Sequence, residues 1–380
     1  MKVFGRNQAQ YAVFILGLLF CSMEIYGQVK TKKYQIPEVA EVGSSGILKA
    51  ELIYSLDNRP TPECHASTIE ETENGLIAAW FGGTHEKHQD VGIWTSINFN
   101  GVWSYPVEVA NGVQNDTLRY PCWNPVLFQP QQGPLMLFYK VGPNPMQWWG
   151  MLMTSEDQGQ TWSEPRKMGE GQHGDLLGPI KNRPYQLPDG TIICPTSIEY
   201  EDDNEDDFWR VFFEISGDNG KSWTATDYIN DGIEFDAIQP SILAHGNNKL
   251  QVLCRTRQQV IAQSWSEDNG KTWGPMTSTG LPNPNSGTDA ITLQDGRHLL
   301  VYNHTIRQGE FPSGRDMLNV AISVDGLQWK PVITLERQEG EYSYPTVIQS
   351  SDGLVHITYT YQRKSVKYVV IDPNQLKIDN

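Results

Sequence analysis

Six polar positions recur along this chain, each lying seven to eleven residues ahead of a predicted hairpin turn. They are His65, Asn124, Arg183 with Asn182, Gln239, Asn285-Ser286, and Tyr342 with Tyr344. Such side chains donate and accept hydrogen bonds, so a ring of them suits a polyol or an acid as ligand. Histidine adds an acid or base that titrates near neutral pH. The alternative is a polar, water-filled channel that performs no chemistry.

Arginines follow the same periodic pattern, just past the predicted second strands and in the loops beyond them. They are Arg255, Arg257, Arg315 and Arg363. The planar guanidinium pairs with a carboxylate through two parallel hydrogen bonds. Because the protein has a net charge of -16, arginines at a channel mouth would differ in charge from the acidic surface around them. Each arginine could instead be an ordinary surface ion-pair partner. The pattern as a whole predicts a site for an anionic, hydroxyl-bearing ligand.

Hairpins must position these residues. Six turns precede apolar runs such as LIAAWF and LVHITYTY: Asn74-Gly75, Gln132-Gly133, Asp189-Gly190, Asn247-Asn248, Asp295-Gly296 and Asp352-Gly353. Asn-Gly and Asp-Gly between apolar runs are strong hairpin signals, because these residues tolerate positive φ. Short strands between turns, without a long helical period, predict an all-β fold.

A second motif, S-x-D-x-G-x-T/S-W, alternates with the hairpins. It is complete at 155–162, 216–223 and 266–273, and degraded at 96–103 and 323–329. One hairpin and one motif per roughly 55 residues predict six four-stranded blades, that is, a six-bladed β-propeller. We expect the motif to be structural, with Asp and Gly forming the turn and Trp packing on the blade. Residues 45–380 would then be a single propeller domain.

The N-terminus has the pattern of a secretory signal peptide. Lys2 and Arg6 precede an apolar run, Tyr11–Met23, that is too short to span a bilayer. We expect cleavage after Gly27, with residues 28–44 as a polar lead-in, and export to the periplasm, the cell surface or the medium. A lipoprotein cleaved before Cys21 is a second possibility, which Phe20 disfavours.

Composition limits the partners. With 45 acidic against 29 basic residues, the chain lacks the basic surface that nucleic acids and anionic membranes need. The mature cysteines, Cys64, Cys122, Cys194 and Cys254, are expected to be small buried hydrophobes, although export would permit disulfides. They lack zinc-site spacing, and His85-x-x-His88 is interpreted as a solvated loop. We therefore expect no metal and no cofactor, and a monomer that binds an acidic glycan.

The repeated motifs resemble the Asp boxes of sialidases. CHASTIEETENGLIAAWFGGT and EYSYPTVIQSSDGLVHITYTYQR are similar to the bacterial group described as predicted neuraminidases. The resemblance covers nearly all of the mature chain and implies a sialidase-like exo-glycosidase acting on a terminal acidic sugar. It also implies site roles: Arg255 and Arg315 as carboxylate-binding arginines, Tyr342 as nucleophile and Asp90 as acid/base.

Two positions depart from the family pattern. His65-Ala66-Ser67 stands where sialidases have Arg-Ile-Pro, and Gln239 stands where a glutamate would support the tyrosine. The predicted catalytic set is therefore Tyr342, Asp90 and His65. The predicted substrate-binding set is Arg255, Arg315, Gln239, Asn124, Arg183 and Tyr344.

These departures leave two alternatives open. In the first, His65 or Tyr342 removes the α-proton of a uronate whose carboxylate the arginines neutralise, which makes the protein a lyase. A resemblance to propeller lyases and hydrolases that act at rhamnose–glucuronate linkages through a central histidine supports this alternative. In the second, the propeller binds glycans without catalysis.

Overall fold

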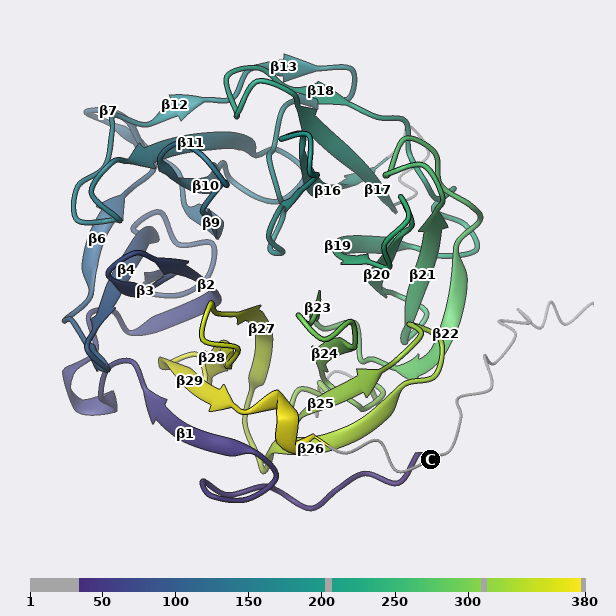
Figure 1. Cartoon of the computed structure of the whole chain (residues 1–380). Helices are drawn as coiled ribbons and strands as arrows, with labels where there is room; N and C mark the ends of the chain where they lie inside the picture. Colours follow the sequence, from purple (N-terminus) through teal and green to yellow (C-terminus); the bar gives the residue numbers. More distant parts are fainter. Residues whose placement is uncertain (1–33, 202–206, 309–312, 377–380) are drawn as a thin grey trace, which may run out of the picture.

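The computed structural model describes residues 34–201, 207–308 and 313–376 and confirms the six-bladed β-propeller. Six sheets are arranged in a ring around a central axis, as Figure 1 shows, and the innermost strands are β2, β9, β15, β19, β23 and β27. We use the term channel for the region around this axis. The predicted signal peptide, residues 1–27, lies outside the described residues.

The blades follow one another along the chain. The first three contain β2 (Glu63–Thr72), β3 (Gly75–Gly83), β4 (Gly92–Phe99) with β5 (Val102–Trp103) and β6 (Val107–Ala110); β9 (Cys122–Phe128), β10 (Leu135–Val141), β11 (Trp149–Ser155) and β12 (Arg166–Lys167); and β15 (Tyr185–Gln186), β16 (Ile192–Glu201), β17 (Asp207–Ser216) and β18 (Thr224–Ala225). Two small ribbons, β7 (Val113–Asn115) with β8 (Leu118–Arg119) and β13 (Glu170–Gly171) with β14 (Gly174–Asp175), lie in the connections.

The last three blades complete the ring. They contain β19 (Ala237–Ala244), β20 (Leu250–Thr256), β21 (Val260–Ser266) and β22 (Thr277–Pro282); β23 (Asp289–Thr292), β24 (His298–Tyr302), β25 (Met317–Ser323) and β26 (Lys330–Arg337); and β27 (Tyr342–Gln349), β28 (Val355–Tyr361), β29 (Ser365–Ile371) and β1 (Ile47–Leu52). Two 3-10 turns, η1 (Leu56–Asn58) and η2 (Pro373–Gln375), follow β1 and β29.

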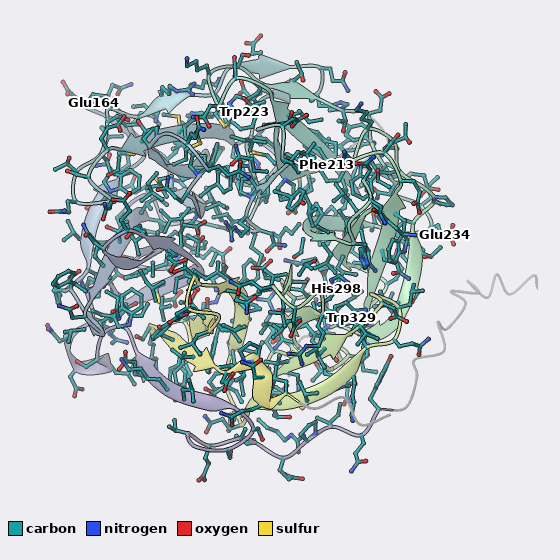
Figure 2. The ribbon with its side chains drawn as sticks, in the orientation of Figure 1. Glu164, Phe213, Trp223, Glu234, His298 and Trp329 are labelled. Atoms are coloured by element: carbon teal, nitrogen blue, oxygen red, sulfur yellow. The ribbon has the colours of Figure 1, made fainter. Side chains whose placement is uncertain are left out.

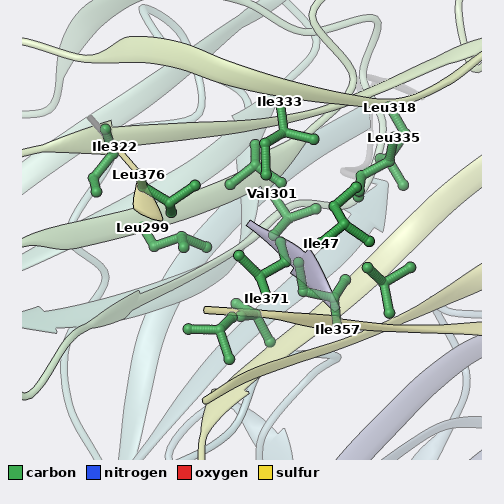
Figure 3. Close-up of a cluster of buried hydrophobic side chains, with 14 of the residues drawn as sticks. Ile47, Leu299, Val301, Leu318, Ile322, Ile333, Leu335, Ile357, Ile371 and Leu376 are labelled. Atoms are coloured by element: carbon green, nitrogen blue, oxygen red, sulfur yellow. The ribbon is translucent and has the colours of Figure 1, made fainter. Parts of the chain in front are cut away.

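The ring is closed by the N-terminal strand. Strand β1 pairs antiparallel with β29, so the sixth blade contains both ends of the propeller. Ile47 of β1 is buried in a cluster that also holds Val301 and Leu318 of blade five and Ile357 of blade six (Figure 3). Apolar side chains from two adjacent sheets interdigitate there, which is how a propeller builds a core between blades.

The Asp boxes form compact turns. In the copy at 266–273, the Asp268 carboxylate accepts hydrogen bonds from the Thr272 amide at 2.8 Å and from the Thr272 hydroxyl at 2.6 Å. Trp273 stacks on Phe213 of the preceding blade with ring centroids 4.7 Å apart. In Figure 2, Trp223 and Trp329 of two other copies lie within the ring of blades, away from the channel. The motif therefore stabilises turns and contacts between blades.

The same backbone irregularity, a residue with a positive φ, occurs at the start of each blade near the channel. One non-glycine residue near the start of each innermost strand has a positive φ: Ala66 (53°), Asn124 (37°), Lys181 (73°), Gln239 (57°), Asn285 (58°) and Tyr344 (52°). Strands β2, β9, β19 and β27 shift register at these points, as β-bulges do. Positive φ is uncommon outside glycine, and a bulge re-aims the side chain it carries.

The cysteines, the lead-in segment and the membrane prediction can be compared with the structure. The four mature cysteines are all buried and free, as predicted. The lead-in segment runs along β26, where the Thr334 hydroxyl donates to the Pro37 carbonyl at 2.7 Å and Val39 forms a bridge with Thr334. Within the described ranges, we find no helix long and apolar enough to cross a membrane. The domain boundaries remain a prediction.

Candidate functional site

Arg255 is the centre of a polar cluster at one end of the channel. It lies near the end of β20, and its guanidinium donates to Asn285 Oδ1 at 2.9 Å and to Gln239 Oε1 at 3.3 Å. Its Nη1 also donates to the Tyr344 hydroxyl oxygen at 2.6 Å. All three partners have a positive φ and come from blades four, five and six. They thus bring three strand starts to one guanidinium.

A second arginine approaches the same tyrosine. The guanidinium carbons of Arg255 and Arg315 lie 5.6 Å and 5.5 Å from the centroid of the Tyr344 ring. Arg315 lies just before β25 and donates to Glu341 Oε1 at 2.9 Å. Two cations at one ring make this end of the channel positive, in a protein that is acidic overall.

Glu341 links the arginines into a chain of ion pairs. Its Oε2 accepts from Arg363 Nε at 2.9 Å, and Arg363 Nη1 reaches Glu86 Oε2 at 2.5 Å. Burial favours the neutral acid, yet the cationic neighbours hold the pKa of Glu341 well below its usual range. Glu341 is therefore ionised and occupies part of the hydrogen-bonding capacity of Arg315.

His65 completes the cluster from the first blade. It is buried, its ring lies 4.2 Å from that of Tyr344, and its Nδ1 is 2.9 Å from the Thr360 hydroxyl. Burial, and then the charge of Arg363, lower the pKa of His65 well below its usual value. The imidazole is therefore neutral at neutral pH, which is the protonation state of a general base.

The two tyrosines of β27 have different environments. Tyr344 carries the positive φ and contacts Arg255 and His65, whereas Tyr342 is fully buried in the apolar cluster between blades five and six. The Tyr342 hydroxyl accepts from Gln362 Nε2 at 2.9 Å. The register shift between Ser343 and Thr346 separates the two side chains. The structure thus gives Tyr344 the position among the arginines that we expected Tyr342 to occupy.

Asp90 lies in the loop between β3 and β4, with its carboxylate bonded to other residues of that loop. It accepts from Thr84 Oγ1 at 2.6 Å and contacts His88 Nδ1 at 2.8 Å. Burial raises its pKa, but these hydrogen bonds lower it further, so the pKa of Asp90 falls below its usual value. The same loop carries Glu86, which joins it to Arg363. None of the contacts described for Asp90 reaches the Arg255 cluster.

Asn124 and Arg183 occupy different ends of the channel. Asn124 is the bulge residue of β9 and shares the end formed by the other bulges. Arg183 lies toward the hairpin end, where its Nη2 pairs with the buried Glu70 carboxylate at 3.1 Å. It borders a cavity of about 310 Å³ together with Ser241 and Asp289. The structure therefore does not bring Arg183 to the arginine cluster.

The sequence analysis did not predict three residues of this region, namely Glu86, Glu341 and Lys181. A fixed spacing identifies Lys181: the residue with a positive φ stands eight residues before the first turn residue in five blades and ten before it in the fifth. That count gives Lys181 and Tyr344 in place of Arg183 and Tyr342, and it gives Ala66 in place of His65. No comparable pattern marks Glu341, which is set by the loop between β26 and β27.

The chemistry available is acid–base and nucleophilic. The cluster offers guanidiniums for an anion, a neutral imidazole and a phenol, with amides from Gln239, Asn285 and Asn124 for hydroxyl groups. No group of three or more His, Cys, Asp or Glu side chains arranged to hold a metal ion occurs in the part of the chain that is described. The protein is thus a six-bladed propeller with a cationic polar site at one mouth.

Comparison with known proteins agrees with this class. A family model described as a BNR repeat-like domain matches residues 74–357, and the chain belongs to this BNR repeat-like family. A search of curated proteins found no match.

Several solved structures share the fold. A Hadza microbial sialidase, Hz136, has 18% identity and a TM-score of 0.71, over 86% of this chain and 69% of its own. A protein of unknown function from Dyadobacter fermentans has 16% identity and a TM-score of 0.68, over 86% and 98%. The NanB sialidase of Streptococcus pneumoniae, as its K499G mutant, has 13% identity and a TM-score of 0.66, over 83% and 69%.

Proposed function

We propose that this protein is a carbohydrate-active enzyme that cleaves the glycosidic bond of a terminal acidic sugar. The observation that carries the proposal is the placement of Arg255 and Arg315 at one tyrosine, Tyr344. Guanidiniums bind a carboxylate bidentately and would hold the sugar with its anomeric carbon near the hydroxyl. The sialidase structures that share the fold support this substrate class.

The first mechanism is hydrolysis with retention. The Tyr344 oxygen attacks the anomeric carbon and passes its proton to His65, while the leaving oxygen takes a proton from an acid. Water then attacks the same carbon and gives a proton to the conjugate base of that acid, and the tyrosine oxygen leaves with the proton held by His65. Asp90 is the candidate acid, but it is ionised and bound to Thr84 and His88. Substrate binding must therefore rearrange the 84–90 loop and protonate this carboxyl.

The second mechanism, elimination, is favoured by one specific observation. The amide of Gln239, rather than a carboxylate, stands near Tyr344, so the base beside the phenol is the neutral His65. With a uronate carboxylate neutralised by the arginines, His65 would take the proton α to that carboxylate, and the C–O bond at the β-carbon would break. The leaving oxygen would take a proton from the Tyr344 hydroxyl. The products are an unsaturated uronate and a free hydroxyl.

A product assay separates these mechanisms. The purified protein is incubated with sialosides and with rhamnosyl-glucuronate glycans, and products are analysed by mass spectrometry and ultraviolet absorbance. Hydrolysis adds one water per bond cleaved and leaves no ultraviolet chromophore, whereas elimination adds none and creates an absorbing double bond. Binding without any product would exclude both enzyme mechanisms and leave the glycan-binding alternative. The Arg255→Lys variant, which keeps the charge but loses the planar fork, should weaken turnover or binding in every case.

We also propose that the protein is exported and acts as a monomer. The motivation is the cationic head and short apolar run of residues 1–27. Fractionation of expressing cells, with N-terminal sequencing of the mature chain, tests the first statement. A mature protein that begins at Met1 and stays in the cytoplasm would contradict it. Sedimentation equilibrium tests the second.

A further inference from the structure

A buried lysine crosses the channel beneath the arginine cluster. Lys181 of blade three is 1% exposed, and its ammonium donates to the carbonyls of Thr288 at 2.8 Å and Pro345 at 2.5 Å. Thr288 belongs to blade five, and Pro345 follows Tyr344 in blade six. Because Pro345 has no amide hydrogen, its only backbone hydrogen-bonding group is the carbonyl, and this carbonyl accepts from Lys181.

The next residue reaches the remaining blade. Asn182, also fully buried, donates through Nδ2 to the Gln239 carbonyl at 2.9 Å and to the Ser241 hydroxyl at 2.8 Å. Its Oδ1 accepts from Lys181 Nζ at 2.8 Å, so the two side chains act as a unit. Lys181 and Asn182, which we term the channel brace, thereby connect blade three to blades four, five and six.

The brace holds the same segments that provide the partners of Arg255. Those partners are Gln239, Asn285 and Tyr344, and the brace binds the Gln239 carbonyl, a carbonyl three residues after Asn285 and the carbonyl next after Tyr344. Each bond lies on the backbone of a bulge or close to one. Movement of the brace would therefore move all three partners.

Gly287 shows how closely the layers pack. A Cβ added at Gly287 would lie 2.8 Å from Lys181 Cε and 3.2 Å from Tyr344 Cδ2. The lysine stem and the tyrosine ring thus flank the same glycine, with no space for a methyl group. The countercharge of Lys181 is Asp289, whose Oδ2 accepts from the Val347 amide of blade six at 2.9 Å. Burial lowers the pKa of Lys181 to about 8, and the charge of Asp289 opposes that shift.

We propose that the channel brace is a positioning element that sets the distance between the Tyr344 hydroxyl and Arg255. It does not contact substrate; it acts through the backbones of blades four, five and six beside their positive-φ residues. The inference rests on the proposed function for its effect on turnover, because Tyr344 is the reacting group there. Its structural part, the position of Tyr344, can be measured without any substrate.

The test replaces Lys181 with methionine, which keeps the stem and removes the ammonium. Chains labelled with ¹³C at tyrosine Cζ give one signal per ordered tyrosine, and the signal absent from Tyr344→Phe is that of Tyr344. We expect this signal to shift or broaden in Lys181→Met while most others stay. On the substrate found in the product assay, kcat should fall on the order of 100-fold, with a much smaller change in KM.

Two further variants keep the result decisive. Val320→Ala creates a cavity in blade five, away from the channel, and serves as a destabilised control whose Tyr344 signal and kcat should match wild type. Asn182→Ala tests the brace if Lys181→Met does not fold, and it should move the Tyr344 signal in the same way. A Tyr344 signal in the folded brace variants that coincides with wild type overturns the proposal. Absence of turnover in wild type contradicts the proposed function alone, since the spectroscopic result stands independently.

Discussion

At the scale of single residues, two tyrosines separated by one serine have opposite roles. Tyr342 fills the core between two blades, while Tyr344 stands among Arg255, Arg315 and His65. In a regular strand both side chains would point to the same face, because the period is two. The positive φ of Tyr344 removes that equivalence. Function and packing can therefore be separated by mutation within one strand.

Removing each tyrosine hydroxyl should produce contrasting results. Tyr344→Phe removes the oxygen that we propose as the reacting group, so kcat should fall on the order of 100-fold or more, and loss of the hydrogen bond from Arg255 should lower the unfolding free energy by about 1–2 kcal/mol. Tyr342→Phe removes the oxygen that accepts from Gln362, which should cost about 1 kcal/mol of stability and leave kcat nearly unchanged. Steady-state kinetics and urea unfolding on both variants decide the matter. The reverse pattern would assign the reacting hydroxyl to Tyr342.

A buried histidine pair predicts a pH dependence of stability. Burial, and then the charge of nearby His245, lower the pKa of His298 from 6.5 to about 4. Because the pKa of His298 is lower in the folded chain, between about pH 4 and 6.5 the imidazole is protonated in the unfolded chain and neutral in the folded chain. The contribution of His298 to the free energy of unfolding is therefore complete above about pH 6.5. It decreases as the pH falls toward 4, by up to about 1.4 kcal/mol per pH unit.

The variant His298→Gln isolates this term. Loss of the contact with Thr292 subtracts the same free energy at every pH, so only the difference between pH 7 and pH 5 is diagnostic. That difference, measured by urea unfolding, should be smaller in the variant than in wild type. Equal differences in the two proteins would show that His298 takes up its proton without unfolding. Groups remote from His298, including the buried Glu214, cancel in this comparison.

At the scale of elements, the bulge is the unit that builds the site. Asn124 and Gln239 could be predicted from sequence, because each lies eight residues before a turn and precedes a proline. A range of seven to eleven residues does not distinguish Tyr344 from Tyr342, since both are tyrosines and they lie two residues apart. The periodicity of the sequence predicts which blade a residue belongs to and at which end of the channel it lies. A bulge shifts the register by one residue, and the alternation of side chains along a strand does not predict where that shift occurs.

The fold itself was more predictable than the site. Turn signals and Asp boxes recur in every blade or nearly so, and an error in one copy is corrected by the others. The contacts of Glu341 and Arg363 occur once and join residues from loops of different blades. Nothing in a local sequence window specifies such a pairing. Side-chain contacts across the channel are therefore identified only from the three-dimensional structure, in which the closed ring brings the blades together.

An Asp-box substitution should affect the element and not the site. Asp268→Ala removes the acceptor of the Thr272 amide and hydroxyl, and should lower the unfolding free energy by about 1–2 kcal/mol. The adjacent Glu267→Ala, which removes only an exposed ion pair with Lys249, should change it by less than about 0.5 kcal/mol. Both variants should retain wild-type kcat per folded molecule. Loss of kcat in folded Asp268→Ala would give the motif a catalytic role that its position does not explain.

At the scale of the whole molecule, the site depends on closure of the ring. The Arg255 cluster draws residues from blades one, four, five and six, and blade six is completed by a strand from the other end of the chain. Any opening between β1 and β29 removes the outer strand that covers blade six. The contacts in the propeller are mostly between neighbours in the ring, so closure joins local blades into one cooperative unit.

Two neighbouring residues of the closing strand test this dependence. Ile47 is 3% exposed in the cluster of Figure 3, whereas Leu48 is 46% exposed on the same strand. Ile47→Ala should lower the unfolding free energy by about 2–5 kcal/mol, because it removes buried methyl groups and leaves a cavity. Leu48→Ala should change it by less than about 0.5 kcal/mol. Since β1 serves the whole ring, Ile47→Ala should shift the urea midpoints followed by tryptophan fluorescence and by circular dichroism together. Separate midpoints would show that blade six opens alone and that the propeller is not a single cooperative unit.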